Sequence, residues 1–368
     1  MKVCIDVQAA VSQRAGVGRY VRELVDHLPE WAGADGVELF YFDFRGRAQP
    51  FRAAGAKARV IRWCPGRWVQ GVWKTIGWPP YEWLAGKADV YHFPNFILPP
   101  LGHGHAVVTI HDVSFMRFPE MAETRNLKHL LDGIGRTVRR ADAILADSRV
   151  IADEIVQVLG AAPSKVHTVY PGISTGFQPS DEKTVAAMRQ RLNIDRPYLL
   201  AVGTIEPRKN LPFLFEVFEH MREFDGLLIL VGSMGWKYEA ILTRLRASPR
   251  AGAIRHLQGV AESDLRALYS GAELLLFPSF YEGFGFPPLE ALACGTPVVS
   301  SAGGSLREVL GSAATIVDSF DVEAWSAAAL RQMGDRSRAK QGRAHAAQYS
   351  WSATARAAWE VYRGLAAC

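Results

Sequence analysis

Short apolar runs alternate with longer segments of helical periodicity along most of the chain. In the first half, the apolar runs predict strands at Val3–Val7, Glu38–Asp43, Asp89–Phe93, Ala106–His111, Ala143–Ala146 and Lys165–Val169. Between them, apolar positions with a helical period predict helices at Gly18–Leu28, Val69–Leu84, Glu120–Arg140 and Val150–Gly160. This alternation indicates β-α units and therefore parallel sheets.

The alternation is interrupted once and then resumes. Tyr170–Pro197 carries prolines, glycines and a Ser-Asp-Glu-Lys sequence, which indicates a hinge region between domains. Beyond it, strands are expected at Tyr198–Gly203, Leu227–Val231, Ile254–Leu257, Glu273–Phe277, Pro297–Ser300 and Thr315–Val317. Helices are expected at Asn210–Met221, Lys237–Ala247, Glu262–Tyr269, Pro288–Cys294 and Asp321–Gln332, and the chain after residue 333 is predicted to be helical to its end.

The two halves predict an α/β protein with two doubly wound, Rossmann-like domains that face each other across a cleft. The expected domains cover residues 1–175 and 176–348, followed by a terminal helix over 349–368. Doubly wound sheets bind ligands at the carboxyl ends of their strands. Candidate functional residues are therefore those that follow the predicted strands.

Composition narrows the class of protein only moderately. The 368 residues are 49% hydrophobic and 21% charged, which excludes a disordered chain. The net charge of +5 suits anionic partners such as nucleotides, phosphates or a membrane surface. Basic residues are scattered and no recognition motif appears, which disfavours a nucleic-acid partner.

Cysteine usage and the N-terminus indicate a cytoplasmic location. Cys4, Cys64, Cys294 and Cys368 form no CxxC pair, which favours reduced thiols in a reducing compartment. The first residues show no signal-peptide pattern. No apolar run approaches the ~18–20 residues that a membrane span needs.

The strongest chemical signal is the segment from Phe277 to Ser300. A buried strand leads into a Gly/Pro-rich loop that carries Glu282, and Glu290 follows eight positions later on the next helix. Two carboxylates placed in this way can accept hydrogen bonds from the vicinal hydroxyls of a sugar or ribose. Gly283 and Gly285 allow close approach of the backbone and leave free N–H groups at a helix start, which favours an anion there.

A second signal covers Gly203–Asn210. A predicted strand ends in Gly203, and Arg208 and Lys209 stand just before a helix start, with Glu206 in the same loop. Two cations and free helix N–H groups suit a pyrophosphate whose charge grows as a leaving group departs. Without an anionic ligand, cations at this end oppose the helix dipole.

Two weaker signals lie in the first half of the chain. His111-Asp112 follows the predicted strand Ala106–His111, where the histidine either satisfies a strand-end carbonyl or faces a ligand. Gly16 and Gly18 open the first long helix. They make a poor dinucleotide fingerprint, because the third glycine of GxGxxG is replaced by Val21.

With these motifs, the chain closely resembles the GT-B glycosyltransferases of family 4, whose E-x7-E signature matches Glu282 and Glu290. Further matches are Ala15-Gly-Val-Gly-Arg-Tyr20, Thr109-Ile-His-Asp-Val113, Val169-Tyr-Pro-Gly-Ile173, Val202-Gly-Thr-Ile-Glu-Pro-Arg-Lys-Asn210, Leu230-Val-Gly-Ser233 and His256-Leu-Gln-Gly-Val260. The resemblance implies that Glu282 contacts hydroxyls of the donor sugar and that Glu290 binds the ribose.

The resemblance assigns further site residues. Arg208 and Lys209 would hold the donor diphosphate, and His111 would help to position the donor sugar. Gly16 and Gly18 would lie against donor phosphate and acceptor, and Val260 would border the base. The other expected donor-binding residues are Gly203, Glu206, Gly283, Phe284 and Gly285, with Gly303 and Gly304 in a loop near the donor.

The implied activity is retaining transfer of a hexose, best matched by mannose from GDP-mannose, to a saccharide or polyprenyl-linked acceptor in bacterial polysaccharide or glycolipid assembly. No cofactor is expected, because the nucleotide-sugar is a substrate. The chain contains no Asp-X-Asp metal-binding signature, so we expect no metal. A front-face displacement needs no covalent nucleophile, and the residues offer no defensible candidate for one.

Several alternatives stay open. A dTDP-rhamnose or UDP-hexose donor fits the same motifs. So does a nucleotide-sugar epimerase or phosphorylase of similar fold, although a phosphorylase needs a cofactor lysine or a phosphate site that we do not locate. A non-catalytic basic protein that binds membranes or nucleic acids is an alternative of another class. An NAD-dependent dehydrogenase is disfavoured by Val21.

The segment Arg62–Lys87 is exceptional in composition, because it holds five of the ten tryptophans among four basic residues. Such chemistry is typical of a membrane interface and would suit peripheral contact with the cytoplasmic face of the inner membrane. The alternative is a helix that packs on the N-terminal sheet through four apolar side chains, Val69, Val72, Trp73 and Ile76. Both interpretations stay open.

The last helix carries apolar residues near helical spacing at Ala353, Ala357, Ala358, Val361, Tyr362 and Leu365. Ser350 or Ser352 can cap its start. In GT-B proteins the C-terminal segment commonly crosses back to the N-terminal domain, so we expect Trp351 and Tyr362 to be buried there. The alternative is packing on the C-terminal domain alone.

Overall fold

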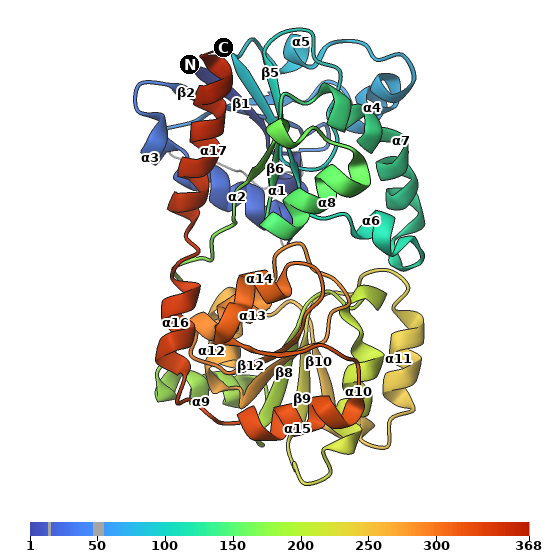
Figure 1. Cartoon of the computed structure of the whole chain (residues 1–368), viewed down its shortest axis with the longest axis vertical. Coiled ribbons are helices and arrows are strands. Elements are labelled where there is room, and N and C mark those ends of the chain that lie inside the picture. Colours follow the sequence, from blue (N-terminus) through green and yellow to red (C-terminus); the bar gives the residue numbers. More distant parts are fainter. Residues whose placement is uncertain (14–15, 47–54, 368) are drawn as a thin grey trace. The chain divides into compact units, whose positions relative to one another are not determined.

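The computed structural model describes residues 1–13, 16–46 and 55–367, so Ala15 and Cys368 lie outside the described part of the chain. The chain divides into two compact units. The first unit comprises Met1–Val113, Arg125–Gly172 and Ser350–Cys368, and the second comprises Ser114–Thr124 and Ile173–Tyr349. Each unit contains one parallel sheet with helices packed around it (Figure 1).

The sheet of the first unit has seven strands within the described residues, in the order β3-β2-β1-β4-β5-β6-β7. The strands are β1 (Lys2–Asp6), β2 (Gly36–Phe42), β3 (Lys57–Ile61), β4 (Val90–Phe93), β5 (His105–Ile110), β6 (Ala143–Ala146) and β7 (Val166–Thr168). The helices are α1 (Gln8–Ser12), α2 (Val17–His27), α3 (Pro29–Ala32), α4 (Gly66–Thr75), α5 (Tyr81–Ala85), α7 (Thr124–Arg140), α8 (Arg149–Leu159) and α17 (Trp351–Ala366). The strand order reverses between β1 and β4, which makes this the switch point of the sheet.

The sheet of the second unit has the order β10-β9-β8-β11-β12-β13, with its switch point between β8 and β11. Its strands are β8 (Tyr198–Val202), β9 (Leu227–Val231), β10 (Ile254–Leu257), β11 (Leu274–Phe277), β12 (Val298–Ser301) and β13 (Thr315–Val317). Its helices are α6 (Ser114–Arg117), α9 (Glu182–Arg191), α10 (Leu211–His220), α11 (Glu239–Arg246), α12 (Glu262–Gly271), α13 (Phe286–Ala293), α14 (Leu306–Leu310), α15 (Val322–Gln332) and α16 (Ala339–Ala346).

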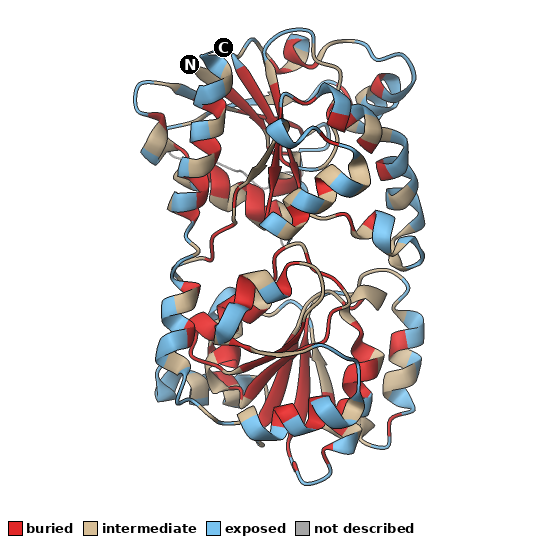
Figure 2. Cartoon of the chain, in the orientation of Figure 1, coloured by how far each residue is buried: buried red, intermediate tan, exposed pale blue. Residues whose placement is uncertain are grey.

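The central strands of both sheets are buried, as Figure 2 shows in red, because parallel sheets are covered on both faces. In the second unit, Phe213 of α10 packs edge to face against Trp325 of α15, with ring centroids 5.6 Å apart. Burial of each such side chain contributes about 2 kcal/mol to folding. The edge strand β3 is largely exposed.

The structure corrects four sequence-based expectations about elements. Strand β3 was not predicted: Lys57–Ile61 is short, alternates charged with apolar residues and is largely exposed. The expected hinge region contains helix α9, whose N-terminus is capped by Asp181 Oδ1 accepting from the Thr184 N–H at 2.7 Å. The helix expected over Val69–Leu84 is two helices, α4 and α5, since Pro79-Pro80 ends the first pattern.

The fourth correction concerns residues 114–124, which were expected in the first domain and belong to the second unit. There the Trp236 indole donates a hydrogen bond to the Met121 carbonyl at 2.6 Å, and the ring of Phe118 lies 5.9 Å from that of Tyr281. The sequence signals only a helix in this region. Its attachment depends on contacts with residues more than a hundred positions away.

The terminal helix α17 belongs to the first unit, where it lies beside α2 (Figure 1). Ser350 caps its start by accepting from the Ala353 N–H at 3.2 Å. Trp351 and Tyr362 are buried, as predicted. The predicted apolar stripe was only partly correct: Ala358 and Tyr362 are buried, but Ala353 is exposed, and Thr354, Ala355 and Trp359 are buried instead.

Among the described residues, no helix is long and apolar enough to cross a membrane.

Candidate active site

At the switch point of the second unit, two loops from neighbouring strands are tied together. Strand β8 leads into the 3-10 turn η3 (Pro207–Lys209), and β11 leads into the loop that carries Glu282. The Phe280 N–H donates to the Arg208 carbonyl at 2.9 Å, and Arg208 Nη1 donates to the Tyr281 carbonyl at 2.5 Å. The backbone thereby holds the cations of one loop against the carboxylate of the other.

Four charged side chains meet between these loops. Arg208 donates to Glu282 Oε2 at 2.7 Å and to Glu206 Oε1 at 2.8 Å. Lys209 Nζ lies 2.5 Å from Glu282 Oε1. Glu206 and Glu282 are both buried. The structure therefore brings together the four charged residues that the sequence predicted in the two loops, as one hydrogen-bonded cluster.

Burial and the neighbouring charges leave the two carboxylates of this cluster with pKa values shifted in opposite directions. Burial alone would raise the pKa of Glu282, but the Arg208 guanidinium and the Lys209 ammonium outweigh it and hold the pKa at about 2. Burial raises the pKa of Glu206, which is hydrogen-bonded to Arg208 but not to Lys209. Glu282 is therefore a permanent anion between two cations.

Glycines shape the loop around Glu282. Gly285 has a φ of 105° and caps the start of α13, which leaves the N–H groups of the first helical turn without helical partners. A Cβ on Gly304 would lie 2.3 Å from the Glu282 carbonyl oxygen. Ser305 closes this contact by donating from Oγ to the Gly283 carbonyl at 2.7 Å. Gly303 and Gly304 thus allow a close turn that supports the Glu282 loop.

The remaining predicted donor residues occupy different environments. Glu290 is buried on α13 and accepts a hydrogen bond from the Tyr269 hydroxyl at 2.8 Å. Phe284 is buried between the rings of Phe286 and Tyr349, so its side chain is part of the packing. Val260 follows β10 and is half-buried.

Gly203 lies next to the cluster, at the end of β8. A Cβ on Gly203 would lie 3.2 Å from Lys209 Cε, so a glycine leaves room for the lysine side chain. Lys209 Nζ also lies 5.3 Å from the centre of the Phe277 ring. The lysine side chain therefore contacts Gly203, Phe277 and Glu282.

In the first unit, His111 follows β5 and is held by two acceptors. Its Nδ1 is 2.8 Å from Asp147 Oδ2, and its Nε2 is 3.1 Å from the Pro94 carbonyl oxygen. Burial opposes the charged form, but the Asp147 carboxylate and these hydrogen bonds together raise the pKa of His111. The histidine therefore has a fixed ring orientation and a raised pKa.

A buried hydrogen-bonded chain links α17 to the strand before His111. The Tyr362 hydroxyl is 2.7 Å from His92 Nδ1, and His92 Nε2 is 2.8 Å from Thr109 Oγ1. Burial lowers the pKa of His92 to about 3, so this imidazole is neutral at ordinary pH. Tyr20 of α2 packs edge to face against His111, with ring centroids 4.7 Å apart.

Gly16 and Gly18 have different structural roles. Gly16 has a φ of 56° and stands at the N-cap of α2. A Cβ on Gly18 would lie 2.2 Å from the Gln13 carbonyl oxygen, so Gly18 allows α1 and α2 to approach each other closely. Packing within the first unit is therefore enough to explain why residue 18 is a glycine.

Comparison with known proteins identifies the family. A family model described as "Glycosyltransferase Family 4" matches residues 14–177, and one described as "Glycosyl transferases group 1" matches residues 185–349. The O-antigen chain mannosyltransferase B of Escherichia coli is 34% identical over 273 residues, which cover 72% of this chain and 71% of that protein. The chain belongs to glycosyltransferase family 4.

Other relatives of this glycosyltransferase carry different names. The D-inositol 3-phosphate glycosyltransferase of Segniliparus rotundus is 29% identical over 360 residues, which cover 92% of this chain and 78% of that protein. The serotype-specific mannosyltransferase WbdA of Escherichia coli is 29% identical over 237 residues, which cover 61% of this chain and 29% of that protein.

Solved structures confirm the predicted GT-B fold of the glycosyltransferase. Sucrose-phosphate synthase from Thermosynechococcus elongatus matches with a TM-score of 0.79 at 20% identity, covering 100% of this chain and 99% of that one. Anabaena HepE in complex with UDP and glucose matches with a TM-score of 0.72 at 16% identity, covering both chains completely. At these identities the likeness concerns the fold alone.

Two residues that support the first unit's site, Asp147 and Tyr362, were not predicted as such from the sequence of this glycosyltransferase. Asp147 directly follows the predicted strand Ala143–Ala146, so the strand-end rule could have indicated it. Tyr362 was predicted to be buried, but nothing in its local sequence indicates His92, which lies 270 positions earlier. Only the packing of α17 brings these two side chains together.

Proposed function

We propose that this glycosyltransferase transfers mannose from GDP-mannose, with retention of configuration, to a saccharide or polyprenyl-linked acceptor in bacterial surface-polysaccharide or glycolipid assembly. The observation that carries the proposal is the cluster of Glu282 with Arg208 and Lys209 at the switch point of the second unit. The preference for mannose is supported by the 34% identity to the O-antigen chain mannosyltransferase B.

The cluster suits a nucleotide-diphosphate sugar for electrostatic reasons. Arg208 and Lys209 supply two cations immediately before the N-terminus of α10, where unpaired N–H groups add positive potential. A diphosphate can take over these cations from Glu282, because phosphate oxygens form strong charge-assisted hydrogen bonds. Glu282 would then be released toward the hydroxyls of the sugar, as the family resemblance implies.

The transfer that we propose is a front-face displacement. The bond between the sugar C1 and the diphosphate oxygen breaks, and its electron pair leaves with the diphosphate. An acceptor hydroxyl forms the new bond to C1 on the same face, and its proton passes to the departing phosphate. Arg208 and Lys209 stabilise the charge that develops on the leaving group.

His111 would hold the donor sugar without acting as a base. Asp147 fixes its Nδ1, so the sugar would take the Nε2 position that now faces the Pro94 carbonyl, and the raised pKa favours donation from the ring. Gly16, Gly283 and Gly285 would offer backbone N–H groups, Glu290 would bind the ribose, and Val260 would border the base.

Exposed aromatic side chains support peripheral contact with the cytoplasmic face of the inner membrane. Of the five tryptophans between residues 62 and 87, only Trp73 is buried, whereas Trp63, Trp68, Trp78 and Trp83 are at least half exposed. Val72 and Ile76 are also exposed, whereas Trp73 is buried and Val69 half-buried, so the alternative in which this segment packs on the sheet through four apolar side chains holds only for part of the set. Large exposed apolar groups beside basic residues are typical of surfaces that bind anionic lipids.

A donor-hydrolysis screen tests the proposed function. Purified protein is incubated with GDP-mannose, UDP-glucose and dTDP-rhamnose without acceptor, and release of the nucleotide is measured with and without excess EDTA. We expect GDP-mannose to be hydrolysed fastest, and EDTA to have no effect because Arg208 and Lys209 neutralise the diphosphate. Faster hydrolysis of another donor, or a strict requirement for Mn²⁺ or Mg²⁺, would refute the corresponding part of the proposal.

A further inference from the structure

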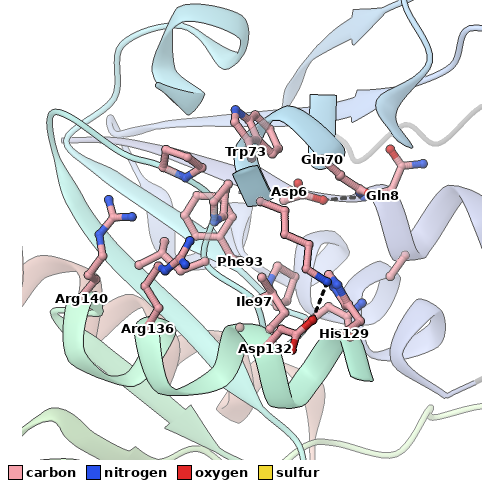
Figure 3. A pocket seen from close by; sticks show the side chains of 18 of the residues that line it. Asp6, Gln8, Gln70, Trp73, Phe93, Ile97, His129, Asp132, Arg136 and Arg140 are labelled. Carbon is pink, nitrogen blue, oxygen red and sulfur yellow. Dashed lines mark hydrogen bonds and ion pairs between the residues drawn. The ribbon is translucent and has the colours of Figure 1, made fainter. Parts of the chain in front are cut away.

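A pocket of about 280 Å³ lies entirely within the first unit, at the switch point between β1 and β4. Residues that follow both strands line it, among them Asp6, Gln8 and Asn95. Helix α4 contributes Trp73 to one wall, and α7 contributes Arg136 and Arg140 to the opposite wall (Figure 3). Doubly wound sheets bind ligands at such a position.

The side of the pocket formed by β1 and α4 combines a fixed carboxylate with a fixed aromatic ring. Asp6 accepts hydrogen bonds from the Gln8 N–H at 2.9 Å and from the Tyr81 hydroxyl at 3.2 Å. Burial raises the pKa of Asp6 to about 6, so the carboxylate is charged at neutral pH. Trp73 is held by a hydrogen bond from its indole N–H to the Pro79 carbonyl at 2.7 Å.

The opposite side of the pocket is cationic. His129, Asp132, Arg136 and Arg140 share one face of α7, at helical spacing. Asp132 is paired with Lys74 at 2.8 Å, and Arg140 donates to the Leu101 carbonyl at 3.1 Å. The Arg136 side chain is exposed and forms no hydrogen bond or ion pair with the described residues, and Figure 3 shows it extending from α7 beside Ile97 and Phe93. Its guanidinium is therefore free to bind an anion in the pocket.

We propose that this pocket is the acceptor site of the enzyme and that it selects a phosphate-bearing glycan. The sugar ring would lie against Trp73 with its hydroxyls donating to Asp6, and the phosphate would lie at Arg136 and Arg140. This inference rests on the proposed glycosyl transfer, and it adds the chemical class of the acceptor and the residues that select it.

The chemistry on the two walls distinguishes this acceptor from a neutral glycan. A carboxylate and amide groups suit hydroxyls, and an aromatic wall suits the apolar face of a ring. A guanidinium without a partner is not needed for a neutral sugar, but it forms paired hydrogen bonds with a phosphate. A shallower hollow shares Gln8, Ser12 and Gln70 with the pocket and would leave room for further sugars.

Calorimetric titration of the full-length protein without nucleotide tests the proposal. The probes are mannose 1-phosphate, mannose, and mannosyl diphosphate linked to a short prenyl chain. The test variant is Arg136→Gln/Arg140→Gln. The matched control is Arg139→Gln, an exposed arginine of the same helix that does not line the pocket. Melting temperatures check that each variant is folded.

We expect mannose 1-phosphate to bind the wild type at least about tenfold more tightly than mannose, and the double variant to lose this preference. The control should retain it. If only the prenyl-linked probe binds, with the same loss in the double variant, the proposal stands and the phosphate comes from a lipid carrier. Equal binding of mannose and the phosphate-bearing probes, or equal loss in the control, would overturn it.

A second variant tests the sugar end of the pocket. Asp6→Asn keeps the size of the side chain and should weaken the binding of mannose 1-phosphate, while binding of inorganic phosphate stays as in the wild type. Equal weakening of both would contradict the assignment of Asp6 to the sugar. These titrations contain no donor, so a different donor in the hydrolysis screen would refute the proposed function and leave the pocket assignment intact.

Discussion

The two sheets of this glycosyltransferase have similar switch points, but ion pairs fill the space at one of them and a pocket lies at the other. In the second unit, the space between the loops after β8 and β11 is occupied by the ion pairs of Glu282 with Arg208 and Lys209. In the first unit, the space beyond β1 and β4 is a pocket with Asp6 on one side and Arg136 on the other. The parallel sheet therefore determines where a ligand can bind, and the loop side chains decide what kind of ligand it is.

The two units also differ in how their cations are held before an anionic ligand binds. In the second unit, the cations are held by a carboxylate whose pKa is about 2, so the cluster is ordered before any ligand arrives. In the first unit, Arg136 has no partner among the described residues. In the second unit, an anion must displace Glu282 from Arg208 and Lys209. In the first unit, an anion can bind Arg136 without displacing a carboxylate.

The largest expected effect comes from removing α17, which tests whether the first unit is complete without its last segment. Truncation after Gln348 removes the buried Trp351, Trp359 and Tyr362. The loss of one such aromatic side chain alone costs about 3–5 kcal/mol, and the whole stability of a domain is only about 5–15 kcal/mol.

We therefore expect the truncated protein to lose cooperative unfolding of the first unit, measured by calorimetry, and to lose turnover. Truncation after Ala366 is the control, since it leaves every buried side chain of α17 in place. Wild-type stability and turnover after truncation at Gln348 would show that the helix is dispensable.

A smaller effect is expected from single substitutions of Lys209 and Glu282 in the charged cluster of the second unit. Lys209→Ala should weaken GDP binding and lower turnover by roughly 10²–10³-fold, because a cation that stabilises the leaving group is lost. Glu282→Ala should abolish transfer while GDP binds at least as tightly as in the wild type, because the carboxylate that competes for Arg208 and Lys209 is gone.

Calorimetry with GDP and a transfer assay distinguish these outcomes. Lys183→Ala, an exposed lysine of α9 in the same unit, serves as the control. A fully active Lys209→Ala enzyme would remove the phosphate assignment. Equal loss of GDP binding in both variants would place Glu282 at the phosphates instead of the sugar.

The smallest effect concerns acid stability and again separates the two units. The pKa of Glu282 is lowered from 4.5 to about 2 in the folded protein, so this group stabilises the second unit fully above about pH 4.5. The contribution is lost as pH falls from there toward 2, and it amounts to about 3 kcal/mol.

The free energy of unfolding, measured between pH 6 and pH 3 by denaturant titration, should therefore fall more steeply in the wild type than in Glu282→Gln. The Glu282 charge also raises the pKa of Glu206, so the difference between the two proteins reports Glu282 together with its effect on Glu206. Parallel pH profiles of the wild type and the variant would contradict the depressed pKa.

Most strands and long helices could be predicted from the sequence, because each is marked by its own apolar pattern. β9, β10 and β13 agree with their predicted limits to the residue. Two of the failures arise because the deciding contact is distant in sequence, whereas helix α9 and the break between α4 and α5 depend on local residues. Strand β3 is short and largely exposed but pairs with β2 from Lys57 to Ile61, and residues 114–124 join the second unit through Trp236.

The sequence by itself determined the family, the doubly wound fold of each unit and the charged residues of the second unit's site, because these depend on local motifs that stand directly after apolar strands. Only the tertiary structure decided the pairing of Glu282 with both cations, the support of His111 by Asp147, and the pocket between α4 and α7. Each of these requires side chains from separate strands or helices to meet. The order of residues in a chain specifies where an element ends, whereas the partner of its last side chain depends on which element packs beside it.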